Sequence, residues 1–173
     1  MKIIVGLGNI GAQYDNTYHN VGFWALDALA DKLNVTFGSS KCDASIALAD
    51  YNGTRILLAK PTTFMNRSGT AVQKLLKYYK CDVGDLVVLY DDIDIPKGKL
   101  RYRESGSSGT HNGMRDIVYY IGENFKRVRI GAGRPPEGWN LANYVLSNVK
   151  AEDKVLLDGA VIGAVDRVLE LCR

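Results

Sequence analysis

Residues 85–91 read Asp-Leu-Val-Val-Leu-Tyr-Asp, a short apolar run with an acid at each end. A run of this length, rich in β-branched residues, predicts a strand buried on both faces in the middle of a sheet. The stretch 2–6, Lys-Ile-Ile-Val-Gly, has the same character. Between and after these strands, apolar residues recur at helical spacing. The predicted helices cover residues 20–34, 68–80, 112–121 and 151–173.

Four further segments are typical of strands. Residues 43–50 and 54–60 flank Asn52-Gly53, a dipeptide that favours a hairpin. Residues 99–103 alternate like a half-exposed strand, and 127–131 form another apolar run. Strands that alternate with helices predict an α/β fold. We therefore expect a single domain over residues 1–173, with a twisted, mixed, largely parallel β-sheet flanked by helices on both faces.

The composition is that of a folded globular protein. Of the 173 residues, 46% are hydrophobic and 24% are charged, which excludes a disordered chain. No apolar run approaches the roughly 18 residues of a membrane span, and the start of the chain lacks the apolar core of a signal peptide. Three cysteines without a CxxC pair do not predict a disulfide framework. We expect a cytoplasmic protein that does not associate with membranes.

Positive charge is concentrated in one part of the chain. Residues 97–134 contain nine basic and three acidic side chains, a net charge of +6, whereas the rest has thirteen and sixteen, a net of −3. Lys97, Lys99, Arg101 and Arg103 alternate with other residues, so an extended segment would place them on one face about 6.6 Å apart. This pattern fits a polyanion such as nucleic acid, although solvated strand faces would produce the same composition.

A glycine motif follows the first predicted strand. Residues 6–11, Gly-Leu-Gly-Asn-Ile-Gly, match the GxGxxG pattern of dinucleotide-binding folds. That fingerprint requires a helix to begin at the glycines, and residues 12–20 lack an apolar period. No strand that ends in an acid follows at the usual distance. We therefore interpret the motif as a turn in which the backbone approaches a ligand or another segment closely.

Polar side chains follow the ends of the predicted parallel strands, where ligands bind in α/β sheets. Convergence of these clusters would place a histidine, an aspartate and several asparagines around one cleft. An imidazole can take a proton from water near neutral pH, and a carboxylate on its other nitrogen fixes its tautomer. Asparagine amides can stabilise an oxyanion. Because no serine or cysteine lies in a nucleophile-elbow motif, this set favours hydrolysis by direct attack of water.

Other interpretations of the same residues remain open. A histidine in a loop and an asparagine before a helix commonly have only structural roles, and Asn66 or Ser68 could cap the following helix. Asp91, Asp92 and Asp94 could bind Mg²⁺.

Taken together, the clusters resemble the bacterial-type peptidyl-tRNA hydrolases. The matching segments occur in the family's order and span nearly the whole chain. They are GLGNIG at 6–11, Tyr14, HNVG at 19–22, PTTFMNRSG at 61–69, YDDIDIPKGKLR at 90–101, GSSGTHNG at 106–113 and RVRIGAGRP at 127–135. The resemblance implies a monomeric α/β enzyme that hydrolyses the ester between peptide and tRNA and needs neither metal nor cofactor. A non-enzymatic RNA-binding protein, similar to the organellar splicing factors of this family, is the alternative.

The resemblance also implies roles for individual residues. His19 would be the catalytic base, and Asp91 would orient it. Contacts with the substrate, its ester end or the attacking water would come from Asn9, Tyr14, Met65, Asn66, His111 and Asn112. Contacts with tRNA would come from Arg101, Arg103 and Arg129. The chain departs from the family pattern at Ile10, where proline is usual, at Tyr18, where arginine is commoner, and at Thr110, which replaces a glycine.

Overall fold

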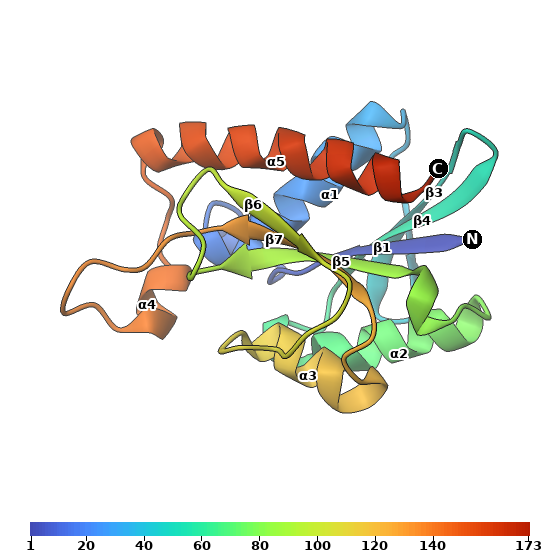
Figure 1. Cartoon of the computed structure of the whole chain (residues 1–173), viewed down its shortest axis with the longest axis horizontal. Coiled ribbons are helices and arrows are strands. Elements are labelled where there is room, and N and C mark those ends of the chain that lie inside the picture. Colours follow the sequence, from blue (N-terminus) through green and yellow to red (C-terminus); the bar gives the residue numbers. More distant parts are fainter.

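The computed structural model describes all residues from 1 to 173 and contains one seven-stranded sheet (Figure 1). The strand order is β2-β3-β4-β1-β5-β7-β6. Strands β4, β1, β5 and β7 are parallel neighbours, whereas β3 and β6 run antiparallel to the strands beside them. The strands are β1 (Lys2–Gly6), β2 (Ser39–Lys41), β3 (Ala44–Tyr51), β4 (Thr54–Pro61), β5 (Leu86–Asp92), β6 (Leu100–Arg103) and β7 (Lys126–Gly131). The predicted mixed, largely parallel sheet is confirmed.

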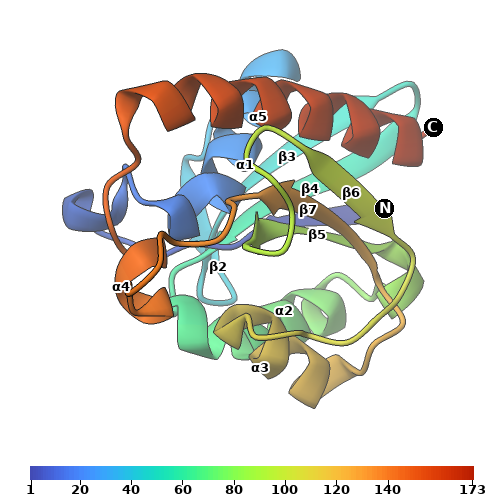
Figure 2. The ribbon, with the colours of Figure 1, turned by 60° about the vertical axis from the view of Figure 1, so that its left-hand side comes forward.

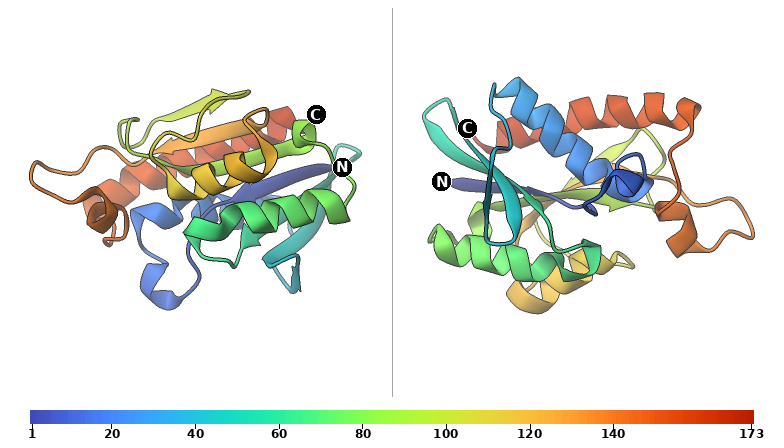
Figure 3. Two further views of the ribbon diagram at one scale, coloured as in Figure 1. Left: turned by 90° about the horizontal axis from the view of Figure 1, so that it is seen from below. Right: turned by 180° about the vertical axis from the view of Figure 1, so that it is seen from behind.

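Helices cover both faces of the sheet. Helices α1 (Val21–Lys32) and α5 (Ala151–Leu171) pack on one face, and α2 (Ser68–Tyr78) and α3 (Asn112–Ile121) pack on the other (Figures 1 and 3). Alternation along each central strand divides its side chains between these two layers. In β1, for example, Ile4 joins the core under α1 and α5, whereas Ile3 and Val5 join the core under α2 and α3.

The principal elements lie where the sequence predicts them, within two or three residues at most ends. The prediction did not include β2 or the short helix α4 (Leu141–Val145), because neither is long enough to show a period. It also did not include the 3₁₀ turns at Tyr18–Asn20 and Met65–Arg67. Strand β6 begins only at Leu100, so the extended run expected from Lys97 onward is shorter than predicted.

The carboxyl ends of β1, β4 and β5 lie at the same edge of the sheet because these strands are parallel. The loops that follow them, the segment before α3 and the helix α4 gather at this end of the molecule (Figure 2). None of the helices combines the length and the apolar character that a membrane crossing requires.

Candidate active site

A cleft of about 610 Å³ opens past the carboxyl ends of β1, β4 and β5. Its walls come from the loops after these strands, from residues 108–112 before and at the start of α3, and from α4. The eight residues for which the sequence predicted catalysis or substrate contact all line it. They are Asn9, Tyr14, His19, Met65, Asn66, Asp91, His111 and Asn112.

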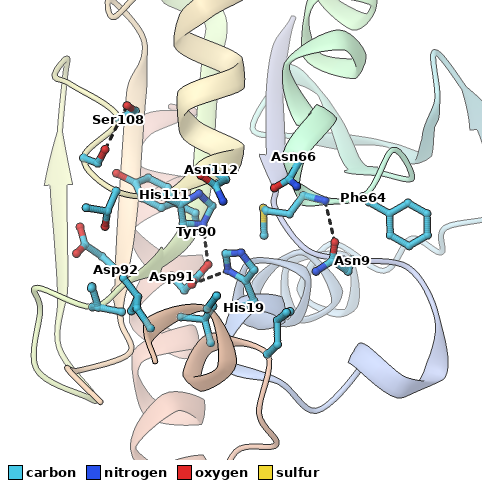
Figure 4. A pocket seen from close by; sticks show the side chains of 18 of the residues that line it. Asn9, His19, Phe64, Asn66, Tyr90, Asp91, Asp92, Ser108, His111 and Asn112 are labelled. Carbon is cyan, nitrogen blue, oxygen red and sulfur yellow. Dashed lines mark hydrogen bonds and ion pairs between the residues drawn. The ribbon is translucent and has the colours of Figure 1, made fainter. Parts of the chain in front are cut away.

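Asp91 lies between two histidines in the middle of this cleft (Figure 4). Its Oδ2 is 2.8 Å from Nδ1 of His19, and its Oδ1 is 2.9 Å from Nε2 of His111. Asp91 is the penultimate residue of β5 and is only 2% exposed. His19 belongs to the 3₁₀ turn that precedes α1, so the turn holds its ring against the end of β5.

The hydrogen bonds around His111 define its tautomer. His111 is the N-cap residue of α3, and its Nδ1 accepts the backbone N–H of Met114 at 3.2 Å. A ring nitrogen that accepts a hydrogen bond carries no proton, so the proton of neutral His111 is on Nε2 and is donated to Asp91. Because Asp91 also accepts from Nδ1 of His19, Nε2 of neutral His19 is left as an unprotonated acceptor. Neither nitrogen of His111 is free for a substrate.

Electrostatics hold this arrangement in its working charge state. Burial alone would raise the pKa of Asp91, but its interactions with His19 and His111 outweigh burial and hold the pKa far below its usual value. For His19, burial alone would lower the pKa, but the charge and hydrogen bond of Asp91 outweigh burial and raise it above its usual value. The pair therefore consists of an ionised carboxylate and a strengthened base.

Asn9 is fixed on both its side chain and its backbone. Its Oδ1 accepts the backbone N–H of Met65 at 2.8 Å, so its NH₂ group is not needed for that contact. Asn20 forms two hydrogen bonds with the backbone of Asn9, one to the N–H at 2.8 Å and one from Nδ2 to the carbonyl at 2.9 Å. Asn20 is 1% exposed. The loop after β1 is thereby held in register with the turn that carries His19.

The loop after β4 supplies one rigid and two accessible side chains. Met65 is 3% exposed and forms part of the core, so most of its side chain is packed away from solvent. Asn66 is exposed beside it, and Phe64 is 51% exposed at the rim. Phe64 has a φ of 59°, a strained conformation for an aromatic residue. The ring of Phe64 packs edge to face against that of Tyr14, with 6.5 Å between the ring centroids.

The three aspartates at and just beyond the end of β5 do not converge as a Mg²⁺ site would require. Asp91 is bonded to the two histidines, Asp92 to Nη1 of Arg129 at 3.2 Å, and Asp94 to Arg134. Each carboxylate is therefore bonded to a different partner. The histidines and Asp91 lie close enough to form a metal-ligating group, but their facing nitrogens are engaged in the two hydrogen bonds already described.

A basic surface adjoins the cleft on β6 and β7. The antiparallel register places Arg101 opposite Arg129 and Arg103 opposite Arg127, so all four project from one face. Arg103, Arg127 and Arg129 line a second cavity of about 240 Å³. This cavity shares Tyr90, Asp92, Asp94, Ser108 and Gly109 with the active-site cleft.

Not all of the predicted positive charge is available to a ligand. Lys97 is in the turn before β6 and forms an ion pair with Asp153, so the prediction that it shares a face with Arg101 and Arg103 is wrong. Arg127 is 1% exposed, and its guanidinium donates to backbone carbonyls. The prediction failed because period 2 holds only within a strand, and β6 does not extend back to Lys97.

Sequence reasoning did not assign a role to several residues that the structure places in or around the cleft. Asn20 and Phe64 lie inside segments quoted for the resemblance, but only their three-dimensional contacts distinguish them. The wall formed by α4 was also missed. Its lining residues are Asn140, Leu141, Ala142, Val145 and Leu146. Asn140 before a short apolar segment was the only available signal, because its side chain caps α4.

Comparison with known proteins gives one consistent result. Residues 3–173 match the model of a family described as peptidyl-tRNA hydrolase. Proteins of that name from Lactiplantibacillus plantarum and Geobacillus kaustophilus are 48% and 45% identical over 97% and 96% of this chain, and over 91% and 90% of their own lengths. The crystal structure of peptidyl-tRNA hydrolase from Acinetobacter baumannii superposes with a TM-score of 0.94 at 36% identity, covering 99% of this chain and 88% of that one.

Proposed function

This chain belongs to the peptidyl-tRNA hydrolase family, and we propose that His19 is the base with which it hydrolyses the ester between peptide and tRNA. The observation that carries this proposal is the 2.8 Å hydrogen bond from Nδ1 of His19 to the buried Asp91, inside a cleft that can hold a substrate. The bond leaves Nε2 of neutral His19 able to accept a proton.

The chemistry divides into two proton transfers. In the first, Nε2 of His19 takes a proton from a water molecule as the water oxygen attacks the carbonyl carbon of the ester. The resulting imidazolium is stabilised by the negative charge of Asp91. In the second, the tetrahedral intermediate collapses, the bond to the ribose oxygen breaks, and His19 returns the proton to that oxygen. The products are tRNA with its hydroxyl restored and a peptide carboxylic acid, which releases its remaining proton to solvent and leaves as the carboxylate.

The asparagines supply hydrogen bonds to the reacting groups. The NH₂ group of Asn9 can donate to the oxyanion, because its Oδ1 is occupied by the backbone of Met65. Asn66 and Asn112 are exposed at the cleft and can hold the attacking water or the peptide amides. Tyr14 and the accessible edge of Met65 form part of the surface against which the substrate lies.

His111 acts on the reaction through Asp91. Its Nε2–H saturates the second carboxylate oxygen, which prevents Asp91 from rotating away from His19. This role differs from direct substrate contact, for which both nitrogens of His111 are already engaged.

The basic surface on β6 and β7 binds the tRNA. Arg101 and Arg103 are exposed on one face of β6, and Arg129 lies opposite Arg101 on the neighbouring strand. Guanidinium groups spaced along a strand match phosphates along a nucleic-acid backbone. Because the second cavity continues into the cleft, a tRNA bound here can extend its 3′ end toward His19.

No step of this scheme requires a metal ion or a cofactor, because the base is activated by Asp91 alone. One chain supplies every group in the scheme, which supports a monomeric enzyme. Its substrate arises in the cytoplasm, which supports a cytoplasmic location. The alternative of a non-enzymatic RNA-binding protein is not favoured, since the chain matches peptidyl-tRNA hydrolases over nearly its whole length and keeps the residues proposed here for hydrolysis.

The test is release of peptide from purified peptidyl-tRNA by the native chain and by His19→Ala, each with and without a chelator. Loss of a general base typically slows turnover by at least ~100-fold. We expect that loss in the variant at a temperature where it is fully folded, with no effect of the chelator on the native chain. Near-native turnover by the variant would show that another group is the base, and inhibition by the chelator would restore the metal hypothesis.

A further inference from the structure

Behind the wall of the cleft lies a cluster of four polar and aromatic side chains, none of which lines the cavity. Tyr18 comes from the turn before α1, Lys97 from the turn before β6, Tyr144 from α4 and Asp153 from the first turn of α5. Tyr18 and Tyr144 are 2% and 3% exposed. The cluster therefore joins four separate segments in the interior of the protein.

Asp153 is the centre of this cluster. Its Oδ2 accepts the hydroxyl of Tyr18 at 2.5 Å and lies 2.9 Å from Nζ of Lys97. The rings of Tyr18 and Tyr144 are stacked, with centroids 4.6 Å apart and planes at 24°. The hydroxyl of Tyr144 donates to the carbonyl of Ala132 at 2.7 Å and not to Asp153.

The charges in the cluster are compensated. Burial would raise the pKa of Asp153, but the hydrogen bonds from Tyr18 and Lys97 outweigh burial and lower it. Burial and the hydrogen bond to Asp153 both raise the pKa of Tyr18 well above its usual value. At neutral pH the cluster therefore contains one carboxylate, one ammonium group and a neutral tyrosine that must donate its proton to Asp153.

The cluster touches the active site through chain neighbours. His19 directly follows Tyr18, so any shift of the Tyr18 ring moves the backbone that carries the catalytic base. Val145 directly follows Tyr144 and lines the cleft. The stack of the two tyrosines thus links the base to the opposing wall.

Backbone contacts reinforce the same link. Thr17 forms an isolated β-bridge with Asn148, and the N–H of Val149 donates to the carbonyl of Asn16 at 2.8 Å. The segment before His19 is therefore fastened to the connection between α4 and α5. The hydroxyl of Tyr18 adds a side-chain hydrogen bond from this segment to α5, because it donates to Asp153. Tyr18 is the residue directly before His19.

We propose that Tyr18 and Asp153 are positioning residues for the hydrolysis, which set the distance between His19 and the α4 wall of the cleft. The inference rests on the role proposed above for His19. It assigns a function to a buried hydrogen bond that the chemistry itself does not use. Lys97 contributes by holding the carboxylate of Asp153 where the hydroxyl of Tyr18 can reach it.

The test compares two variants that each remove one buried hydroxyl from the same stack. Tyr18→Phe breaks the bond to Asp153, whereas Tyr144→Phe breaks a bond to a backbone carbonyl. Each should lower the melting temperature by about 2–4 °C. At a temperature where both are fully folded, we expect Tyr18→Phe to lower kcat about tenfold with KM within twofold of the native value, and Tyr144→Phe to leave both within twofold.

A spectroscopic measurement separates positioning from general stability. The chain has only two histidines, so the ring resonances of His19 and His111 can be followed individually by NMR. Tyr18→Phe should shift the resonances and the titration midpoint of His19 and move the ring resonances of His111 less. Tyr144→Phe should change neither. Native kcat and an unmoved His19 in Tyr18→Phe would overturn the proposal, as would equal losses of kcat in the two variants.

These outcomes are distinguishable from a failure of the proposed function. If His19 were not the base, Tyr18→Phe could still move its ring signals, but His19→Ala would retain activity. Should Tyr18→Phe fail to fold, Lys97→Met removes the ammonium group from Asp153 and keeps an unbranched side chain that is one atom shorter. Lys97→Met should shift the ring resonances of His19 in the same direction by a smaller amount and lower kcat several-fold. Unshifted resonances together with native kcat would overturn the proposal.

Discussion

Asp91→Asn should disable the base by forcing its proton onto the wrong nitrogen, and His111 determines which way the new amide turns. The Nδ1 of His111 is held by the backbone N–H of Met114, so His111 can only donate toward position 91. The amide oxygen must therefore face His111, and the NH₂ group must face Nδ1 of His19. His19 then carries its proton on Nε2, which is the nitrogen that must accept the proton of the attacking water.

The magnitude follows from the contacts that a reversed amide would break. Reversal would require His111 to change tautomer, which breaks the one hydrogen bond that caps α3 and leaves the buried N–H of Met114 facing Nδ1–H, at a cost of about 2 kcal/mol. A cost of about 2 kcal/mol corresponds to about 30-fold in the population of the competent tautomer. The loss of the carboxylate charge adds to this, and conversion of a triad carboxylate to an amide costs ~10⁴-fold in total.

Removal of His111 should consequently have opposite effects in two backgrounds. In the native chain, His111→Ala loosens Asp91 and should lower kcat about tenfold. In the Asp91→Asn background it frees the amide to turn its oxygen to His19, so the double variant should be about 30-fold faster than Asp91→Asn alone. The assay is single-turnover release of peptide from peptidyl-tRNA, with NMR of the remaining His19 ring to read its tautomer. A double variant as slow as Asp91→Asn, or slower, would refute the tautomer assignment.

Three further outcomes test other parts of the site. The kcat/KM of the native chain should rise with pH along a limb centred above 6.5, because Asp91 raises the pKa of His19 and only the unprotonated ring is a base; a midpoint below that value would contradict the assignment. Asn20→Ala should lower kcat about tenfold by releasing the backbone of Asn9, whereas a change in KM alone would argue against this role. Arg103→Ala should raise KM for peptidyl-tRNA and reduce the salt slope by about one, with little effect on a substrate that carries only the 3′-terminal nucleotides. Arg55→Ala, at the amino-terminal end of β4, is the control and should change neither KM nor the salt slope. Equal effects of Arg103→Ala and Arg55→Ala would show that the basic surface does not bind tRNA.

The sequence was sufficient to predict the sheet and the neighbourhood of the site. The apolar run at 85–91 and the hairpin at Asn52-Gly53 each contain their own structural signal, because burial on both faces and turn chemistry are local properties. The convergence of His19 and Asp91, 72 positions apart, was also predictable, since parallel strands bring their carboxyl ends to one edge.

The contacts that tune the site could not be predicted in the same way. The tautomer of His111 depends on a hydrogen bond to Met114 and on the direction of Asp91, which only the packed structure defines. Likewise, the ion pair of Lys97 with Asp153 depends on a turn that redirects the chain before β6. Such contacts join residues far apart in sequence, and no period or motif encodes them.

The glycines at 6–11 match the GxGxxG pattern of dinucleotide-binding folds, but in this structure they have a different physical role. Helix α1 begins at Val21 rather than at the glycines, so no helix N-terminus is available there for a pyrophosphate. A Cβ on Gly6 would lie 2.3 Å from the carbonyl oxygen of Gly22, and one on Gly22 would lie 2.6 Å from the carbonyl oxygens of Leu7 and Leu89. The two glycines therefore allow α1 to pack directly against the ends of β1 and β5. Because His19 lies in the turn that leads into this helix, two residues before its first residue, close packing at Gly22 helps to bring the base within 2.8 Å of Asp91.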